Sequence, residues 1–508
     1  MPVNTNESRS LTEKAKAYFT NFHETHEELY RNAIDDETAV TWLLGQIPLF
    51  SCSDKTVEET YYFRFWSYRK HLRKTPEGWV ITEFLPPVGW SGKYNTISCA
   101  LGHQIHEGRW LNDKIYIKDD IRAFLRPDRL KDCLAYSNSL IPAACAYCVD
   151  YGDKAFAEEI YPGLERYYRA MQELHDTKYG LYWSNDDRDG MEYSISGSGL
   201  RPTINSYLYG AARGMAALCS MLANGKESQY EAEADTLRTL ILQYLWDEKD
   251  GFFKTVPMPE RDGEADFSRS DPAHNVMEEI GFVPWCFEGL TGPEHDRAFV
   301  YLDDPAHFLA PYGITTADMA HPAFMRCTAR HECLWDGPVW PFATAQTLTG
   351  LYTLLRSRTD TGIGAESYMK HLHTYAASQR LYKDGRVIPW IDENLEPFTG
   401  QWISRDLILL DHIYRDKFQR ERGAEYNHSA FCDLVLSGAC GIRISGGILR
   451  AKPLAAGIWR DFTVENLRIG ENVYALCYDA DSVSAPLTLY RNGSAVAAGK
   501  TEIAVSLL

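Results

Sequence analysis

The chain has 508 residues, of which 45% are hydrophobic and 24% are charged, the composition of an ordinary globular protein with enough apolar residues for a large core. Its formal net charge is −18, and phosphate backbones and anionic lipid surfaces repel a chain of this charge. We therefore expect neither nucleic acid nor a membrane as a partner, and a neutral small molecule suits the charge better.

The first residues, Met1 to Lys16, are polar and charged and lack the apolar segment of a secretory signal. No apolar run approaches the ~18 residues that would span a membrane, so the sequence predicts a cytoplasmic protein. The 12 cysteines lie mostly in apolar helical contexts, for example Cys145, Cys219 and Cys432. We expect them to be reduced core residues.

Apolar residues recur at helical spacing along most of the chain. The predicted helices lie within residues 11–44 (one or two helices), 56–72, 96–105, 140–149, 153–175, 208–222, 228–246, a segment that ends at 355, 366–380 and 431–436. Residues 79–84 alternate like a strand, which Pro86 and Pro87 end.

The connections between these helices alternate in character. Every second loop is long and rich in Trp, Tyr, Asp, Glu and Gly, and the others are short or plainly polar. Alternate loops gathered at one end of a closed ring of helical hairpins would form a single pocket, and loops on a rigid scaffold are where function usually lies. Few strands are expected before residue 440, which disfavours a doubly wound sheet.

The character of the chain changes after Gly441, where short segments predict strands. The predicted strands span residues 442–445, 448–451, 461–466, 474–478, 487–490 and 495–498. Asn492-Gly493 is a strong signal for a hairpin turn. The sequence thus predicts a helical domain over residues 1–440 and a small antiparallel, sandwich-like β domain over residues 441–508.

One long loop combines carboxyl groups, aromatic rings and glycines. The stretch Asp189-Gly190-Met191-Glu192-Tyr193 follows Trp183, and a polar helix entry that begins at Arg201 comes after it. Carbohydrate chemistry needs this mixture, because an acid must lie beside the scissile oxygen and flat rings must stack on the sugar. The alternative is an acidic surface loop in which the glycines form turns.

Two later loops supply further carboxyl groups. The loop from Trp390 to Gly400 contains Glu393, and the loop from Gly423 to Ser429 contains Glu425. Glycoside hydrolysis uses two carboxyl groups that face each other across the anomeric carbon. Burial against aromatic rings can keep one of them protonated by raising its pKa. A ring of helices can bring such distant loops together.

Five stretches resemble motifs of known glycosidases. Gly190-Met191-Glu192-Tyr193-Ser194 resembles the E-S-G-(W/M)-D-x-S signature of trehalases and family 63 glycoside hydrolases, and Glu393 to Gly400 resembles their E-(N/K)-Y-(D/N)-P-x-T-G signature. Trp335 to Trp340 is similar to their G-P-(V/I)-W loop, and Gly423 to Tyr426 is similar to the G-G-E-Y loop of trehalases. Trp90 to Asn95 occupies the place of their W-x-W-D motif. The matches run in family order and cover most of residues 60–440.

The resemblance implies membership of the inverting glycosidases with an (α/α)6 toroid, the six-hairpin barrel, which also include mannosylglycerate hydrolases. It implies Glu192 as the general acid, Glu393 as the general base and Glu425 as a substrate contact. The sequence departs from the family at two points. The acid is Glu rather than Asp, which leaves Asp189 as an alternative acid. The gap from Glu393 to Glu425 is longer than in trehalases, which leaves Glu425 as an alternative base.

Further residues of the motif-bearing loops are expected to bind the substrate. They are Trp90, Tyr94, Asn95, Trp183, Asp189, Tyr193, Arg201, Trp335, Asp336, Trp340, Glu425 and Tyr426. Core packing explains each tryptophan as readily as stacking on a sugar does. In the alternative interpretations, Asp336 caps the following helix and Arg201 satisfies a helix start.

These observations predict an exo-acting glycoside hydrolase that inverts the anomeric centre and removes a terminal sugar from a short oligosaccharide or glycoside. The chemistry requires no metal and no organic cofactor. The alternatives are a sugar phosphorylase or epimerase on the same barrel, and a non-catalytic sugar-binding homologue. A phosphorylase needs an anion site, and no cluster of Arg, Lys and His lies beside Glu393 in the sequence. The sequence indicates neither the sugar, nor its linkage, nor the oligomeric state.

Overall fold

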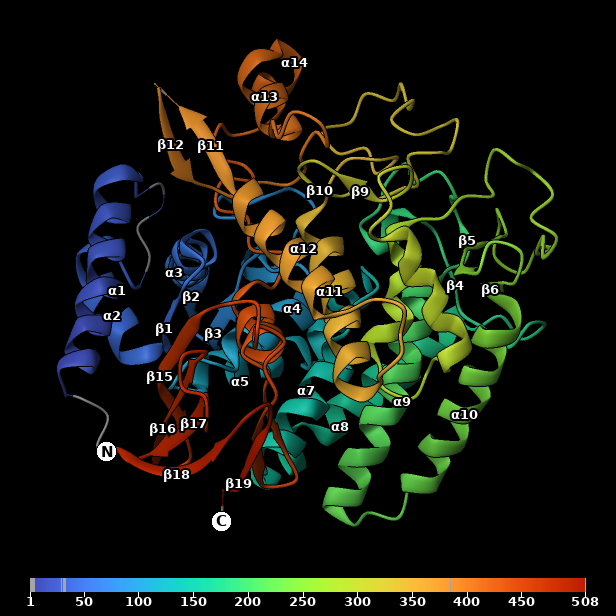
Figure 1. The fold of residues 1–508 in the computed structure, drawn as a ribbon. Coiled ribbons are helices and arrows are strands. Elements are labelled where there is room, and N and C mark those ends of the chain that lie inside the picture. The colour runs from blue at the N-terminus through green and yellow to red at the C-terminus, as the bar shows by residue number, and fades with distance from the viewer. Residues whose placement is uncertain (1–4, 29, 31–32, 384, 508) are drawn as a thin grey trace.

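The computed structural model of the chain describes residues 5–28, 30, 33–383 and 385–507. Its helices lie before residue 441, and the C-terminal residues form strands (Figure 1). The α-helices are α1 (Thr5–Thr25), α2 (Asp36–Gln46), α3 (Lys55–Lys70), α4 (Leu101–Gly108), α5 (Ile115–Phe124), α6 (Leu130–Leu134), α7 (Leu140–Tyr151), α8 (Lys154–Ala170), α9 (Pro202–Leu222), α10 (Glu227–Tyr244), α11 (Pro341–Ser357), α12 (Ala365–Ser378), α13 (Ile403–Leu410) and α14 (His412–Lys417). The longer 3-10 segments are η5 (Glu279–Cys286) and η6 (Pro293–Tyr301), and η7 (Leu434–Ala439) is a π-helix.

The strands are mostly short. They are β1 (Leu49–Cys52), β2 (Leu72–Thr75), β3 (Gly78–Ile81), β4 (Trp183–Ser184), β5 (Gly199–Leu200), β6 (Trp246–Asp247), β7 (Phe252–Phe253), β8 (Val256–Pro257), β9 (Leu309–Ala310), β10 (Gly313–Ile314), β11 (Arg380–Lys383), β12 (Arg386–Pro389), β13 (Ile442–Ser445), β14 (Ile448–Ala451), β15 (Asp461–Ile469), β16 (Asn472–Asp479), β17 (Leu487–Arg491), β18 (Ser494–Gly499) and β19 (Ile503–Ser506). The expectation of a mainly helical chain followed by β structure is confirmed.

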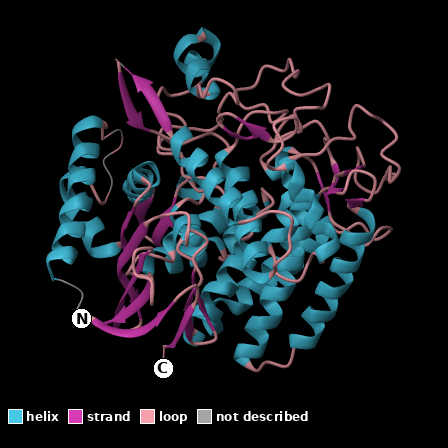
Figure 2. Ribbon diagram, viewed as in Figure 1, coloured by secondary structure: helices cyan, strands magenta, loops and turns pink. Residues whose placement is uncertain are grey.

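Successive helices pack against one another in chain order. Helix α4 packs on α7, α7 on α9, α9 on η5, η5 on α11, and α11 on η7. Helices α8, α10 and α12 lie against members of this series. Figure 2 shows the long loops gathered over the upper end of the helices, away from the C-terminal strands.

Helix α4 contacts η7, which is the last member of the series. The Glu107 carboxylate at the end of α4 accepts hydrogen bonds from the backbone N–H groups of Phe431 (2.7 Å), Cys432 (2.9 Å) and Asp433 (2.6 Å). Asp433 in turn accepts hydrogen bonds from Arg109, at 2.6 Å. A buried carboxylate on the first member thus satisfies the donors at the start of the last member.

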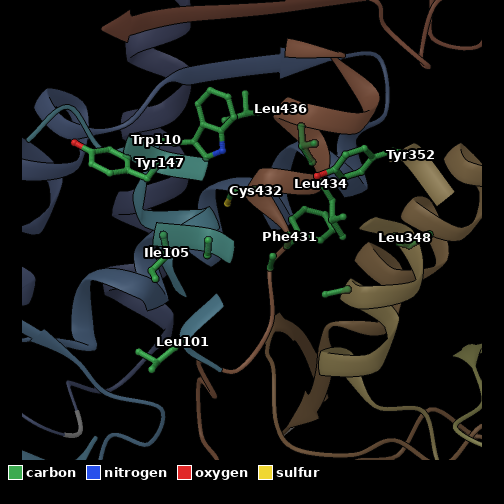
Figure 3. Close-up of a cluster of buried hydrophobic side chains, with 14 of the residues drawn as sticks. Leu101, Ile105, Trp110, Tyr147, Leu348, Tyr352, Phe431, Cys432, Leu434 and Leu436 are labelled. Carbon is green, nitrogen blue, oxygen red and sulfur yellow. The ribbon is translucent and has the colours of Figure 1, made fainter. Parts of the chain in front are cut away.

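Apolar and aromatic side chains fill the space between these helices. Leu101 and Ile105 of α4, Leu348 of α11, Phe431, and Leu434 of η7 belong to one cluster of buried hydrophobic residues, part of which Figure 3 shows. All five side chains are buried. The residues at helical spacing in the sequence therefore form the contact surface between these helices.

The C-terminal strands form two antiparallel sheets. The larger sheet has the order β1-β15-β16-β17-β18, and the smaller one has the order β13-β14-β19. The strands predicted after residue 441 are confirmed, and Asn492 takes the positive φ (50°) of the expected hairpin turn. One edge of the larger sheet is β1 from the N-terminal part, in which Leu49 pairs with Glu465.

One helix begins later than predicted, and another was not predicted. The helix expected over 96–105 begins only at Leu101. Tyr94 and Asn95 adopt left-handed backbone conformations (φ 62° and 61°), and Thr96 is extended (φ −98°, ψ 146°). The helix α5 was not predicted. Its adjacent Asp119 and Asp120 suggest an exposed face, but both carboxylates accept backbone hydrogen bonds from β3, at 3.0 and 2.9 Å.

None of the 12 cysteines, all of which lie in the described part of the chain, forms a disulfide. Among the described residues, no helix is both long enough and apolar enough to cross a membrane.

The contact between Glu107 and the start of η7 predicts a large effect on stability. Replacing Glu107 by Leu leaves three buried N–H groups without an acceptor, and each such group costs ~1–3 kcal/mol. The denaturant midpoint of Glu107→Leu should therefore fall well below that of the wild type. Glu159→Gln is the matched control, because it breaks an exposed ion pair with Arg122 whose contribution is at most ~1 kcal/mol. Equal midpoints for Glu107→Leu and the wild type would contradict this role.

Candidate active site

A pocket with a volume of about 350 Å³ opens among the long loops. Five of its lining side chains carry carboxyl groups: Glu83, Asp187, Glu192, Glu332 and Glu393. Its aromatic lining consists of Phe84, Trp90, Tyr136, Trp335, Trp340 and Tyr426. This combination of carboxyl groups and aromatic rings has the composition that sugar chemistry needs.

Glu192 lies in the pocket at the end of a tight turn. Gly190 takes the left-handed conformation that the turn requires (φ 69°), and Met191 is fully buried in the aromatic cluster behind the pocket. The Trp335 indole N–H donates to the Glu192 carboxyl at 3.0 Å. Burial raises the pKa of Glu192 to about 7.

Arg201 holds the loop that carries Glu192. Its side chain is fully buried and donates to the Asp189 carboxylate at 2.6 Å. It also donates to the hydroxyls of Ser194 and Ser196 and to the Gly197 carbonyl. A charge buried in this way is stable only with such a set of partners, so the ion pair and the loop conformation depend on each other.

Glu393 lies in the same pocket and contacts an arginine. The residue is 7% exposed, and the Arg422 guanidinium lies 3.1 Å from Oε1 and 2.7 Å from Oε2. Burial raises the pKa of Glu393 above its usual value, and Arg422 opposes this rise. Arg422 also lies 3.3 Å from the Glu332 carboxylate.

The Arg422 side chain connects three loops. Its guanidinium lies over the rings of Phe84 and Trp90 (5.4 Å each) and of Phe418 (4.7 Å). The next residue, Gly423, has a φ of 79° and approaches the Asp392 carboxylate so closely that a Cβ would lie 2.3 Å from its Oδ1. A glycine is therefore required for the Arg422 loop to reach Glu393.

The structure brings together only some of the residues that the motifs suggest. The expected residues that line the pocket are Glu192, Glu393, Trp90, Trp335, Trp340 and Tyr426. The expected residues outside the lining are Tyr94, Asn95, Trp183, Asp189, Tyr193, Arg201, Asp336 and Glu425.

The two alternative catalytic carboxylates are both engaged by buried cations. Asp189 pairs with Arg201, and Glu425 pairs with Lys70 of α3 at 2.6 Å. Both carboxylates are buried. Neither lines the pocket, so each serves in the structure as a contact between loop and helix.

Several other expected residues make local hydrogen bonds. The Asn95 amide donates to the carbonyls of Phe84 and Pro86 (3.0 Å each), and the Trp183 indole donates to the Met258 carbonyl. The Asp336 carboxylate accepts the Cys327 N–H at 2.7 Å. These residues shape the loops around the pocket.

The predicted site lacked several residues that line the pocket, among them Glu83, Tyr136, Glu332 and Arg422. Glu83 follows a strand and carries no motif of its own, and Tyr136 belongs to a loop that was not singled out. Glu332 lies just before the Trp335 motif. Arg422 lies 29 residues after Glu393 in the chain, so the absence of a cation beside Glu393 in the sequence was misleading. The signal that could have found Arg422 is its place directly before Gly423, at the start of a recognised motif.

Comparisons with known proteins identify the family of the chain. Residues 93–429 match the family described as the mannosylglycerate hydrolase MGH1-like glycoside hydrolase domain. A solved structure named sialidase is 34% identical, with a TM-score of 0.85, and the match covers 97% of this chain and 44% of that chain. An uncharacterized protein of Borreliella burgdorferi is 24% identical over 185 residues, which are 34% of this chain and 35% of the relative.

The GH78 family rhamnosidase of Bacillus sp. GL1 is 13% identical, with a TM-score of 0.56, over 87% of this chain and 41% of that chain, which shows a shared fold. The chain spans less than half the length of these relatives. The expected membership of the six-hairpin glycosidases is confirmed. Because the family model covers well over half of the residues, the chain carries a glycoside hydrolase domain and belongs to the mannosylglycerate hydrolase MGH1-like family.

Proposed function

We propose that this protein is an exo-acting, inverting glycoside hydrolase that releases a terminal neutral sugar from a short oligosaccharide or glycoside. Glu192 is the general acid and Glu393 is the general base. The observation that carries the proposal is the pocket itself, in which two carboxyl groups from distant loops have different electrostatic surroundings. Inverting hydrolysis needs one carboxyl group with a proton and one without.

The surroundings of Glu192 suit a proton donor. With a pKa raised to about 7 by burial, it retains a proton in a substantial fraction of molecules near neutral pH, where an ordinary glutamate is ionised. The Trp335 indole N–H holds the carboxyl group in place. The proton can thus be delivered to the leaving oxygen from a fixed position.

The surroundings of Glu393 suit a base. Arg422 contacts both carboxylate oxygens, and a permanent cation in such a forked contact stabilises the ionised carboxylate. An ionised Glu393 can accept a proton from the attacking water. Asp189 and Glu425 are less suited to either role, because each is already paired with a buried cation outside the pocket lining.

We infer that the helices form an (α/α)6 barrel. The packing series α4, α7, α9, η5, α11 and η7 supplies six inner members, and the contact of Glu107 with Phe431 to Asp433 closes the series. We assign residues 1–440 to this catalytic barrel and residues 441–508 to a β domain, to which β1 adds an edge strand.

The charges of the pocket favour a neutral substrate. Arg422 contacts two carboxylates, and among the described residues that line the pocket it is the one permanent cation, against five carboxyl groups. A carboxylate or phosphate on the substrate would therefore meet like charge without a free partner. The same observation disfavours a sugar phosphorylase, which must bind phosphate beside the base.

Substitution of each proposed catalytic residue tests the assignment. Glu192→Gln and Glu393→Gln should each lower kcat by ~10²–10⁴-fold, measured with whichever nitrophenyl glycoside the wild type cleaves. Glu396→Gln is the control, because Glu396 belongs to the same motif as Glu393 but does not line the pocket. Full activity of both variants would refute the assignment, and loss in Glu425→Gln with activity retained in Glu393→Gln would move the base to Glu425. Proton NMR should detect the inverted anomer first.

The pH dependence follows from the protonation of Glu192. Because the acid must carry its proton, kcat/KM should fall as the pH rises through about 7, where this carboxyl loses it. A pH series of kcat/KM for the free enzyme provides the measurement. A kcat/KM that stays constant up to about pH 9 would exclude Glu192 as the acid, because a carboxyl group with a pKa of about 7 is almost fully ionised at that pH.

The charge of the substrate can be tested with matched glycosides. A nitrophenyl pyranoside should be cleaved at least ~100-fold faster, in kcat/KM, than the uronide of the same sugar, because facing like charges cost several kcal/mol. This ratio of kcat/KM values should decrease at higher ionic strength, which screens the repulsion. Equal or preferred cleavage of the uronide would overturn the proposed substrate class and leave the hydrolase assignment intact.

A further inference from the structure

A third carboxyl group, that of Glu83, lies in the pocket with Glu192 and Glu393. Glu83 follows β3 at the start of the first long loop and is 5% exposed. Its backbone carbonyl accepts the Asn427 N–H at 3.0 Å, and the adjacent Phe84 carbonyl accepts the Asn95 amide. The first and last loops therefore hold Glu83 in one position beside the catalytic pair.

The two oxygens of the Glu83 carboxyl group have different partners. The Tyr426 hydroxyl donates to Oε1, and Tyr426 itself lines the pocket. Oε2 is buried and has no hydrogen-bond partner among the described residues. A buried polar atom without a partner is costly, and in a substrate pocket a bound ligand can supply the missing partner.

The protonation state of Glu83 decides what Oε2 can do. The pKa of Glu83 is raised to about 8. Burial is the main cause, the Tyr426 hydrogen bond and Arg422 oppose the rise, and the neighbouring Glu393 and Glu192 contribute to it. At neutral pH the group is therefore mostly protonated. A protonated carboxyl group has one O–H donor, and because Oε1 already accepts the Tyr426 hydrogen bond, the O–H belongs on Oε2.

We propose that Glu83 determines specificity by donating a hydrogen bond to a hydroxyl group of the bound sugar. This inference rests on the proposed hydrolase function. Inversion uses one acid and one base, and Glu192 and Glu393 fill these roles, so the reaction leaves Glu83 free for recognition. A neutral donor also suits the neutral substrate that the pocket charges favour.

The test compares two substitutions with opposite expected results. Glu83→Gln keeps a neutral donor of the same length and should retain kcat/KM within ~10-fold, whereas Glu83→Ala removes the donor and should lose ~10–100-fold. Glu83→Asp shortens the side chain by one methylene, and its kcat/KM should lie between those of the Gln and Ala variants. This variant keeps the test valid if the Ala variant does not fold. Glu83→Gln should also keep the fall of activity through about pH 7 that Glu192 produces.

Monodeoxy analogues of the cleaved glycoside identify the hydroxyl. With the wild type, kcat/KM for one analogue should be ~10–100-fold lower than for the parent glycoside. With Glu83→Ala, the same analogue and the parent should have equal kcat/KM, because the two changes remove the same hydrogen bond. If each deoxy analogue lowers kcat/KM by the same factor in the wild type and in Glu83→Ala, Glu83 contacts no hydroxyl and the proposal fails.

Two other outcomes would also overturn the proposal. If Glu83→Gln is as inactive as Glu192→Gln, Glu83 transfers a proton. If Glu83→Gln and Glu83→Ala both have wild-type activity, Glu83 has no role in recognition. Neither outcome bears on the hydrolase function, which fails only if Glu192→Gln and Glu393→Gln remain fully active.

Discussion

The ion pair between Arg422 and Glu393 is the interaction on which the pocket depends. Arg422 contacts both oxygens of Glu393 and one of Glu332, and its guanidinium lies over the rings of Phe84 and Trp90. One side chain thereby joins three loops that are distant in the sequence. A buried arginine without its carboxylates would be very unfavourable, so these loops adopt their positions together.

The same arrangement gives the pocket carboxyl groups different electrostatic surroundings. Burial raises the pKa values of Glu393, Glu192 and Glu83 alike. Arg422, which contacts both oxygens of Glu393, opposes that rise at Glu393. Pairs of carboxyl groups with such different surroundings can act as acid and base at one pH. The aromatic residues that line the pocket therefore contribute to the burial that raises these pKa values, in addition to providing a surface for a sugar ring.

The sequence predicted much of the fold because local rules determine it. Apolar spacing placed helices such as α7 and α12, and alternation with turn residues placed the C-terminal strands. The misses have physical causes. Helix α5 buries two aspartates against the backbone of β3. The helix predicted over residues 431–436 is present, but it continues as the π-helix η7 to Ala439, a form that a periodicity of 3.6 residues does not reveal.

By itself, the sequence determined the alternation of helices and loops and the motif-bearing loops that carry Glu192 and Glu393. These features depend on residue type and on short spacings. Only the tertiary structure decided which carboxyl groups share a pocket. It paired Asp189 with Arg201 and Glu425 with Lys70, and it placed Glu83 and Arg422 beside Glu393. The electrostatic state of a carboxyl group depends on burial and on charges a few ångströms away, and those neighbours come from loops hundreds of residues apart in the chain.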